Sequence, residues 1–150
     1  MKFVYFGHSR FTYGTKEEKK AVEIIRKKFP DYRILNPNKK KHQDNCSNYY
    51  SGVAGTEMEY FLNLTKMCEF GIFMVYDENK WSPGSYTEAT KMIMDGKKVY
   101  LLNPSNWEIK RITKINDHYS FNEENERLQD VWKYPLSEEN GWVNEKYTII

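Results

Sequence analysis

The stretch "GIFMVYDENKWSPGSYTEATKMIMDGKKVYLL", residues 71–102, decides the fold. Its first part, 71–76, is apolar at every position, which is typical of a strand covered on both faces of a sheet. An acid and a polar loop follow, and then 85–95 shows the apolar spacing of a helix that Gly96 ends. A second apolar run at 98–103 completes a strand–helix–strand unit. Such a unit predicts two parallel strands joined by a right-handed crossover.

The same alternation runs through the N-terminal half of the chain. Short apolar runs predict strands at 2–7 and 31–37, and helical periodicity predicts helices at 14–29 and 55–70. The polar segment 38–52, which contains three consecutive lysines, predicts a long loop. The whole order predicts an α/β fold of the Rossmann or flavodoxin-like kind, doubly wound around a mainly parallel sheet.

The chain of 150 residues suits a single domain. We expect a core at about 1–104 and a C-terminal extension at 105–150, in which 107–112 and 118–121 could form further strands and 122–134 one more helix. The extension is too rich in tryptophan to predict disorder. Three tryptophans should be buried against the core or against a second copy of the chain: Trp107, Trp132 and Trp142.

Composition limits the partners. The formal net charge of +2 is too small to indicate a nucleic-acid polymer or a membrane as the partner. No apolar run has the length of a membrane span, and no signal segment precedes the first strand pattern. Cys46 and Cys68 lie in unrelated contexts without metal-ligand spacing, so we expect free thiols in a cytoplasmic protein rather than a disulfide.

Glu88 is the first candidate for chemistry, since ligands of such folds bind beyond the carboxyl ends of the strands. The string Ser85-x-x-Glu88 also fits a capping box, in which the glutamate only reaches back to the helix start. Similar strings occur at Gly14-Thr15-x-x-Glu18 and at Gly55-Thr56-x-x-Glu59. Only the copy with Glu88 directly follows a fully apolar strand. A partly dry carboxylate there has a shifted pKa and can act as a nucleophile or as an acid and base.

Three neighbours of Glu88 in the sequence can likewise have either a structural role or a role in ligand binding or catalysis. Asp77 ends its strand and is either a solvated acid or a second carboxylate that binds a ribose hydroxyl or moves a proton. Gly84 and Ser85 form either an ordinary turn or a helix start whose free amides bind a phosphate or a sugar hydroxyl.

The loop after the first strand, within "YFGHSR" at 5–10, is the second place to look. Gly7 and Ser9 could hold a phosphate with nearby amides, and Arg10 could pair with it. Tyr5 is either a packed core residue or a hydrogen-bond partner of an acid at the sheet end. His8 stands alone, and we interpret it as structural. The spacing is not that of a dinucleotide-binding fingerprint.

Other catalytic motifs do not occur in the sequence. It contains no nucleophile-elbow serine, no phosphate-binding P-loop, no zinc pattern and no Cys/His pair at useful spacing. We therefore expect carboxylate chemistry with no metal and no organic cofactor.

Two segments resemble the nucleoside 2-deoxyribosyltransferase-like family. "VYFGHS" at 4–9 is similar to its opening strand and turn, and 71–102 is similar to its second block. The resemblance covers roughly residues 2–103. It implies a Rossmann-like fold and cleavage of an N-glycosidic bond in a nucleoside or nucleotide, by transfer to another base or to water. It also implies that Glu88 is the nucleophile, that Asp77 orients the sugar or protonates the base, and that Tyr5 is the active-site tyrosine.

Further expectations come from the same resemblance. In the branch of 2′-deoxynucleoside 5′-phosphate N-hydrolases, the phosphate would lie near Ser9, Arg10 and Ser85. Members usually form homo-oligomers. The chain departs from the family in having His8 where glycine is usual and in its long, tryptophan-rich extension. Two other classes stay open: a module of the same fold that binds a nucleotide or nucleotide-derived signal without cleaving it, and a structural protein whose tail is an interface.

Overall fold

A five-stranded sheet in the order β2-β1-β3-β4-β5 forms the centre of the protein. The computed structural model describes residues 2–9, 12–50, 57–75 and 81–115. Along the chain, the elements are β1 (Phe3–Gly7), α1 (Lys16–Lys28), β2 (Arg33–Leu35), α2 (Lys40–Tyr50), α3 (Glu57–Lys66), β3 (Phe70–Met74), α4 (Pro83–Met94), β4 (Lys98–Asn103) and β5 (Glu108–Ile112).

Four of these strands run parallel, as predicted. β1 pairs with β2 on one side and with β3 on the other, and β3 pairs with β4. β3 therefore lies in the middle of the sheet, and all five of its residues are buried. This burial explains why the strand is apolar throughout. The α/β, Rossmann- or flavodoxin-like fold class is confirmed.

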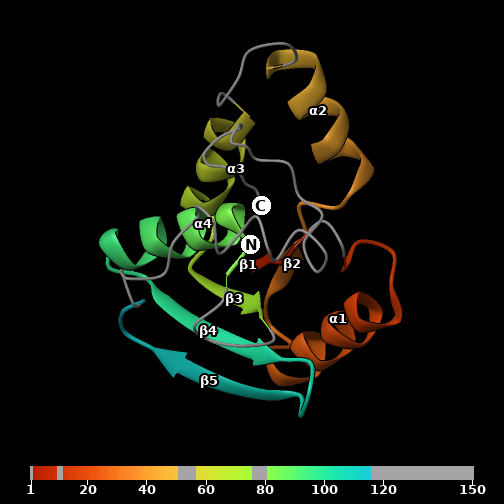
Figure 1. The fold of residues 1–150 in the computed structure, drawn as a ribbon, viewed down its shortest axis with the longest axis vertical. Coiled ribbons are helices and arrows are strands. Elements are labelled where there is room, and N and C mark those ends of the chain that lie inside the picture. The colour runs from red at the N-terminus through yellow and green to blue at the C-terminus, as the bar shows by residue number, and fades with distance from the viewer. Residues whose placement is uncertain (1, 10–11, 51–56, 76–80, 116–150) are drawn as a thin grey trace.

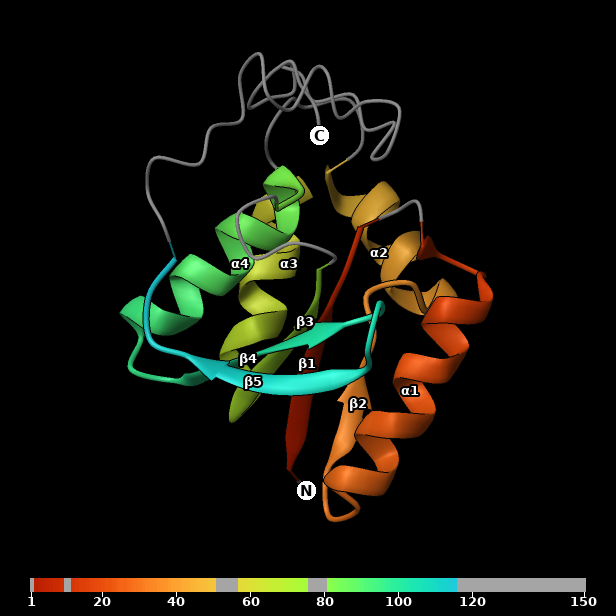
Figure 2. The ribbon, with the colours of Figure 1, turned by 60° about the horizontal axis from the view of Figure 1, so that its bottom comes forward.

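Helices cover both faces of the sheet (Figures 1 and 2). On one face, Ala21 and Ile25 of α1 join Val4 and Phe6 of β1 in a buried cluster. On the other face, α3 and α4 contribute to a second cluster around Tyr5 and Phe73. Alternate residues of β1 thus point to opposite layers, so that Tyr5 faces the α3 and α4 side.

The predicted loop at 38–52 is wrong, because most of it is the helix α2. Its polar composition hid it, since no broad apolar stripe marks it in the sequence. Tertiary contacts hold it instead: Cys46 is buried, and His42 Nδ1 lies 2.9 Å from the Tyr60 hydroxyl of α3. Helices of this length generally need such packing to be stable.

The start of the extension continues the sheet. β5 confirms the strand predicted at 107–112 and pairs antiparallel with β4. Trp107, which precedes it, is half-buried against the α1-side cluster rather than fully buried. The predictions for 118–121, 122–134, Trp132 and Trp142 lie outside the described residues.

Two smaller findings concern the cysteines and the membrane. Cys46 and Cys68 are both buried free thiols, as expected. Within the described ranges, no helix combines the length and the apolar character that crossing a bilayer requires.

Candidate active site

The topology places a switch point at the carboxyl ends of β1 and β3. From β1 the chain passes through α1 to β2, whereas from β3 it passes through α4 to β4 on the opposite face. The strand order reverses between β1 and β3, and such switch points are where ligands bind in open α/β sheets. The described residues that follow these two strands are 8–9 and 12–15 after β1, and 75 and 81–82 after β3.

Glu88 lies beside this switch point, in α4. The helix begins at Pro83 with Ser82 as its N-cap, so Ser85 is already the third helical residue. The capping-box interpretation of Glu88 is therefore wrong. The signal missed in the sequence is Ser82-Pro83, since proline favours the first helical position. With no role at the helix start, Glu88 instead points to the sheet and is 7% exposed.

Gly7 at the end of β1 makes room for the Glu88 carboxyl. A β-carbon at Gly7 would lie 3.3 Å from Glu88 Oε1 and 2.3 Å from the Phe73 ring. The second distance is far below any ordinary contact, so Phe73 would have to move. Glycine at this position lets the carboxyl and the strand end approach each other closely.

Tyr5 comes from the same strand and is fully buried. Its hydroxyl has no hydrogen-bond partner among the described residues. Burial, followed by the nearby Glu88 carboxylate, raises the pKa of Tyr5 well above its usual value. A buried hydroxyl without a partner costs free energy, so this group is a candidate for contact with a ligand or with Glu88 during a reaction.

The ionisation of Glu88 is strongly perturbed. Burial raises the pKa of its carboxyl from 4.5 to about 8, and the Tyr5 hydroxyl offsets only part of this effect. The two side chains shift each other's pKa, although the Tyr5 hydroxyl makes no hydrogen bond of regular geometry within the described residues. About nine tenths of the Glu88 carboxyls are therefore neutral at pH 7. Such a group can donate a proton, or react as a poorly solvated anion once it is ionised.

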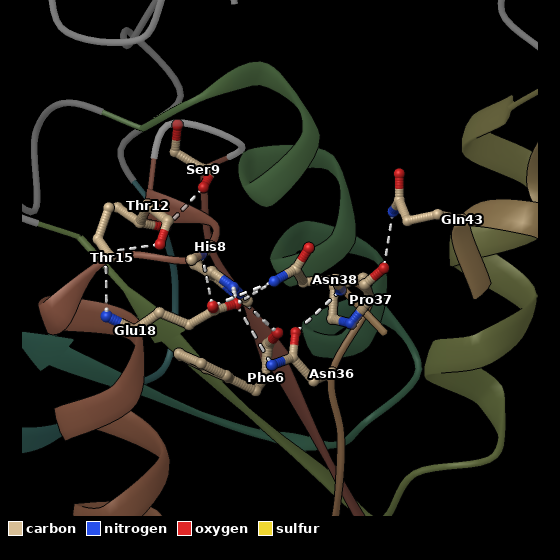
Figure 3. A network of polar contacts seen from close by, with 11 residues as sticks. Phe6, His8, Ser9, Thr12, Thr15, Glu18, Asn36, Pro37, Asn38 and Gln43 are labelled. Atoms are coloured by element: carbon tan, nitrogen blue, oxygen red, sulfur yellow. Dashed lines mark hydrogen bonds and ion pairs between the residues drawn. The ribbon is translucent and has the colours of Figure 1, made fainter. Parts of the chain in front are cut away.

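A second buried acid, Glu18, differs from Glu88 in having several hydrogen-bond partners (Figure 3). Glu18 Oε2 lies 2.8 Å from His8 Nε2, and the Glu18 carboxylate also accepts hydrogen bonds from the Gly14 amide and from the side chains of Asn36 and Asn38. Burial acts to raise the pKa of Glu18, but the hydrogen bonds outweigh it and lower the pKa to about 2.

His8 and Glu18 together fix the loop after β1. His8 Nδ1 lies 3.1 Å from the carbonyl oxygen of Phe6. With Glu18 ionised, both ring nitrogens face acceptors, and both can donate only if the ring is protonated. In the same loop, Thr12 donates from its backbone and its hydroxyl to the Ser9 carbonyl (Figure 3). His8 therefore has a structural place, on the α1 side of β1.

The structure brings together some of the residues predicted from the sequence. Tyr5, Gly7 and Glu88 share one environment between β1 and the middle of α4. Three others border it in the chain: Ser9 is buried after β1, and Gly84 and Ser85 lie in the first turn of α4, where Ser85 is buried. Asp77 and Arg10 lie outside the described residues.

No group of three or more His, Cys, Asp or Glu side chains in the described ranges is placed to hold a metal ion. Comparisons with protein-family models, with curated proteins and with solved structures found no match to this chain. The resemblance to the deoxyribosyltransferase-like family stays a prediction, and the argument for function rests on the geometry around Glu88.

Proposed function

We propose that this protein cleaves the N-glycosidic bond of a nucleoside or nucleotide, with Glu88 as the nucleophile and with a second base or water as the acceptor. One observation carries the proposal: a buried carboxyl with a pKa of about 8 lies at the switch point of the sheet, beside Tyr5 and Gly7. Perturbed acids in such positions are characteristic of catalytic sites.

The chemistry needs a carboxylate of this kind. As the C1′–N bond breaks, positive charge develops on the sugar, and an anion below the ring stabilises it. An ionised Glu88 oxygen forms a bond to C1′, while the electron pair of the C1′–N bond goes to the base, which takes up a proton. Water or another base then attacks C1′ and releases the Glu88 carboxylate.

Tyr5 and Gly7 assist Glu88 in this proposal. Because its pKa is raised, the Tyr5 hydroxyl keeps its proton and can donate a hydrogen bond to the Glu88 carboxylate. This contact would stabilise the Glu88 anion before it attacks C1′, and again when water or the second base releases it from C1′. Gly7 has no side chain, so the Phe73 ring and the Glu88 carboxyl pack against the end of β1, and this packing would hold the carboxyl in position.

The remaining predicted residues take supporting roles in the proposal. Asp77 would protonate the base or orient the sugar. Proline has no N–H at the start of α4, so Gly84 and Ser85 carry the first free amides of that helix, and their position supports binding of a phosphate or a sugar hydroxyl there. Ser9 and Arg10 would hold the same phosphate from the loop after β1.

Incubation with a panel of nucleosides and deoxynucleotides, with detection of free base, tests the proposal. Release of base from at least one deoxynucleoside or its 5′-phosphate is expected, and a second free base in the assay separates transfer from hydrolysis. Saturable binding of a panel member without any release of base would contradict the enzymatic proposal. The resemblance also predicts a homo-oligomer, which light scattering on the purified chain tests, and the two free thiols support a cytoplasmic location.

A non-catalytic nucleotide-binding module is the second candidate, and the neutral state of Glu88 at pH 7 favours it. A protonated carboxyl donates one hydrogen bond to a bound ligand without attacking it. In that case, affinity would fall as the pH rises through about 8, where Glu88 loses its proton. An enzyme with Glu88 as nucleophile would instead gain activity over the same range.

A further inference from the structure

A cavity lies away from Glu88, between α1 and the edge strand β2. Its volume is about 500 Å³, within the range of small-molecule sites. β2 pairs only with β1, so the cavity borders the open edge of the sheet. α1 covers the face of the sheet opposite to α4 (Figure 2). The cavity beside α1 therefore lies apart from Glu88, which belongs to α4.

Three cations line this cavity, one from each neighbouring segment: Arg26 from α1, Arg33 from β2 and Lys39 just before α2. None of the described lining residues is acidic. The three side chains make no ion pair or side-chain hydrogen bond with any described residue. The first turn of α2, next to Lys39, carries no acid that could compensate them. Positive charge is therefore concentrated around a concave surface without internal neutralisation.

The rest of the wall is apolar and held in place. Val22, Tyr32 and Ile34 line the cavity, are partly buried, and pack against the buried cluster on the α1 face. At the far end, the Asn36 amide donates to Glu18 in the buried polar network (Figure 3). A fixed wall with apolar and cationic parts suits a ligand that has both an anionic group and an apolar or aromatic group.

We propose that this cavity is a binding site for a small phosphate-bearing molecule with an apolar or aromatic part. A small molecule fits better than an extended peptide, because β2 has only three residues and offers little edge for strand addition. It also fits better than a nucleic-acid polymer, because the whole chain has a net charge of only +2. The site is independent of the proposed glycosidic chemistry.

Pyrophosphate and phenyl phosphate, titrated into the full-length protein by calorimetry, test this site. Neither probe contains a glycosidic bond, so the result does not depend on the activity of Glu88. We expect saturable binding at one site per chain. Phenyl phosphate should bind more tightly than inorganic phosphate titrated as a third probe, since the ring contacts the apolar wall. Absence of saturable binding up to about 10 mM would overturn the proposal.

Charge-neutral variants locate the site. Arg33→Gln, and separately Arg26→Gln, should weaken binding at least tenfold, because each removes a charged donor from the cavity. Arg111→Gln is the matched control, since Arg111 is exposed on β5, the opposite edge strand. It should change affinity less than twofold. All three side chains are exposed, so folding should be unaffected.

Three results would overturn the proposal. If Arg111→Gln weakens binding as much as Arg33→Gln, the probes respond only to overall charge. If Glu88→Gln, rather than Arg33→Gln, removes binding, the probes bind beside Glu88 at the switch point between β1 and β3. If a single-stranded oligonucleotide binds but pyrophosphate and phenyl phosphate do not, the surface recognises a polymer. Lys39→Gln, which leaves β2 unchanged, should also weaken binding of the probes, because Lys39 lines the same cavity.

Discussion

Replacing Glu88 with glutamine should make the protein more stable at neutral pH. The folded state holds the Glu88 carboxyl at a pKa of about 8, against 4.5 for an ordinary glutamate. Since the folded pKa is raised, the stability linked to the proton is fully present below 4.5 and is lost as the pH rises towards 8. Glutamine has nearly the same shape and no such pH dependence.

The magnitude follows from the two pKa values. Between these two pKa values, the free energy of unfolding of wild type falls by about 1.4 kcal/mol for each pH unit. The loss amounts to about 3 kcal/mol at pH 7 and to less than 1 kcal/mol at pH 5. Relative to wild type, Glu88→Gln should therefore gain about 2 kcal/mol between pH 5 and pH 7. For a chain of 150 residues, this corresponds to about 5 °C or more in Tm.

Urea unfolding of wild type and Glu88→Gln at pH 5, 6, 7 and 8 measures this difference. Glu59→Gln is the matched control, because Glu59 is exposed on α3 and its replacement should leave the pH dependence of wild type unchanged. A Glu88→Gln protein that is less stable than wild type at pH 7 would refute the reasoning. It would mean that Glu88 is ionised and stabilised by charge in the folded state.

The same geometry predicts three further outcomes. If the protein releases base, kcat/KM should rise about tenfold per pH unit up to about pH 8, where Glu88 ionises, and a profile that falls over this range would contradict a nucleophilic role. Gly7→Ala should cost about 1–3 kcal/mol in urea unfolding, since its β-carbon would overlap the Phe73 ring; a neutral effect would show that the ring moves freely. Glu18→Gln should lower the free energy of unfolding by about 3 kcal/mol at pH 7, because Glu18, with a pKa of about 2, stabilises the fold as an anion. This loss should shrink as the pH falls from 4.5 towards 2, and a loss independent of pH would contradict the ion pair between His8 and Glu18.

The sequence predicts the sheet well because short apolar runs mark its strands. The run that forms β3 is apolar throughout, and the parallel direction of the strands follows from their alternation with helices such as α1 and α4. α2 could not be predicted in the same way, because its stability depends on contacts with α3 such as that between His42 and Tyr60.

The site is predictable in part only. The place of Glu88 after an apolar strand predicts a catalytic carboxyl, but Ser85-x-x-Glu88 equally fits a capping box. Only the start of α4 at Pro83 excludes the capping box. The difference between Glu88 and Glu18 is not visible in the sequence at all. It depends on donors distant in the chain, such as His8 and Asn36, which reach one carboxylate and not the other.

Release of free base by wild type and by Glu88→Gln, measured at pH 8 with saturating substrate, tests the central claim most directly. The account predicts that the variant still binds substrate and that its turnover falls by orders of magnitude, because loss of the charge that stabilises the transition state costs several kcal/mol. The Glu59→Gln control should turn over like wild type. A Glu88→Gln protein that releases base as fast as wild type would contradict the assignment of Glu88 as the nucleophile.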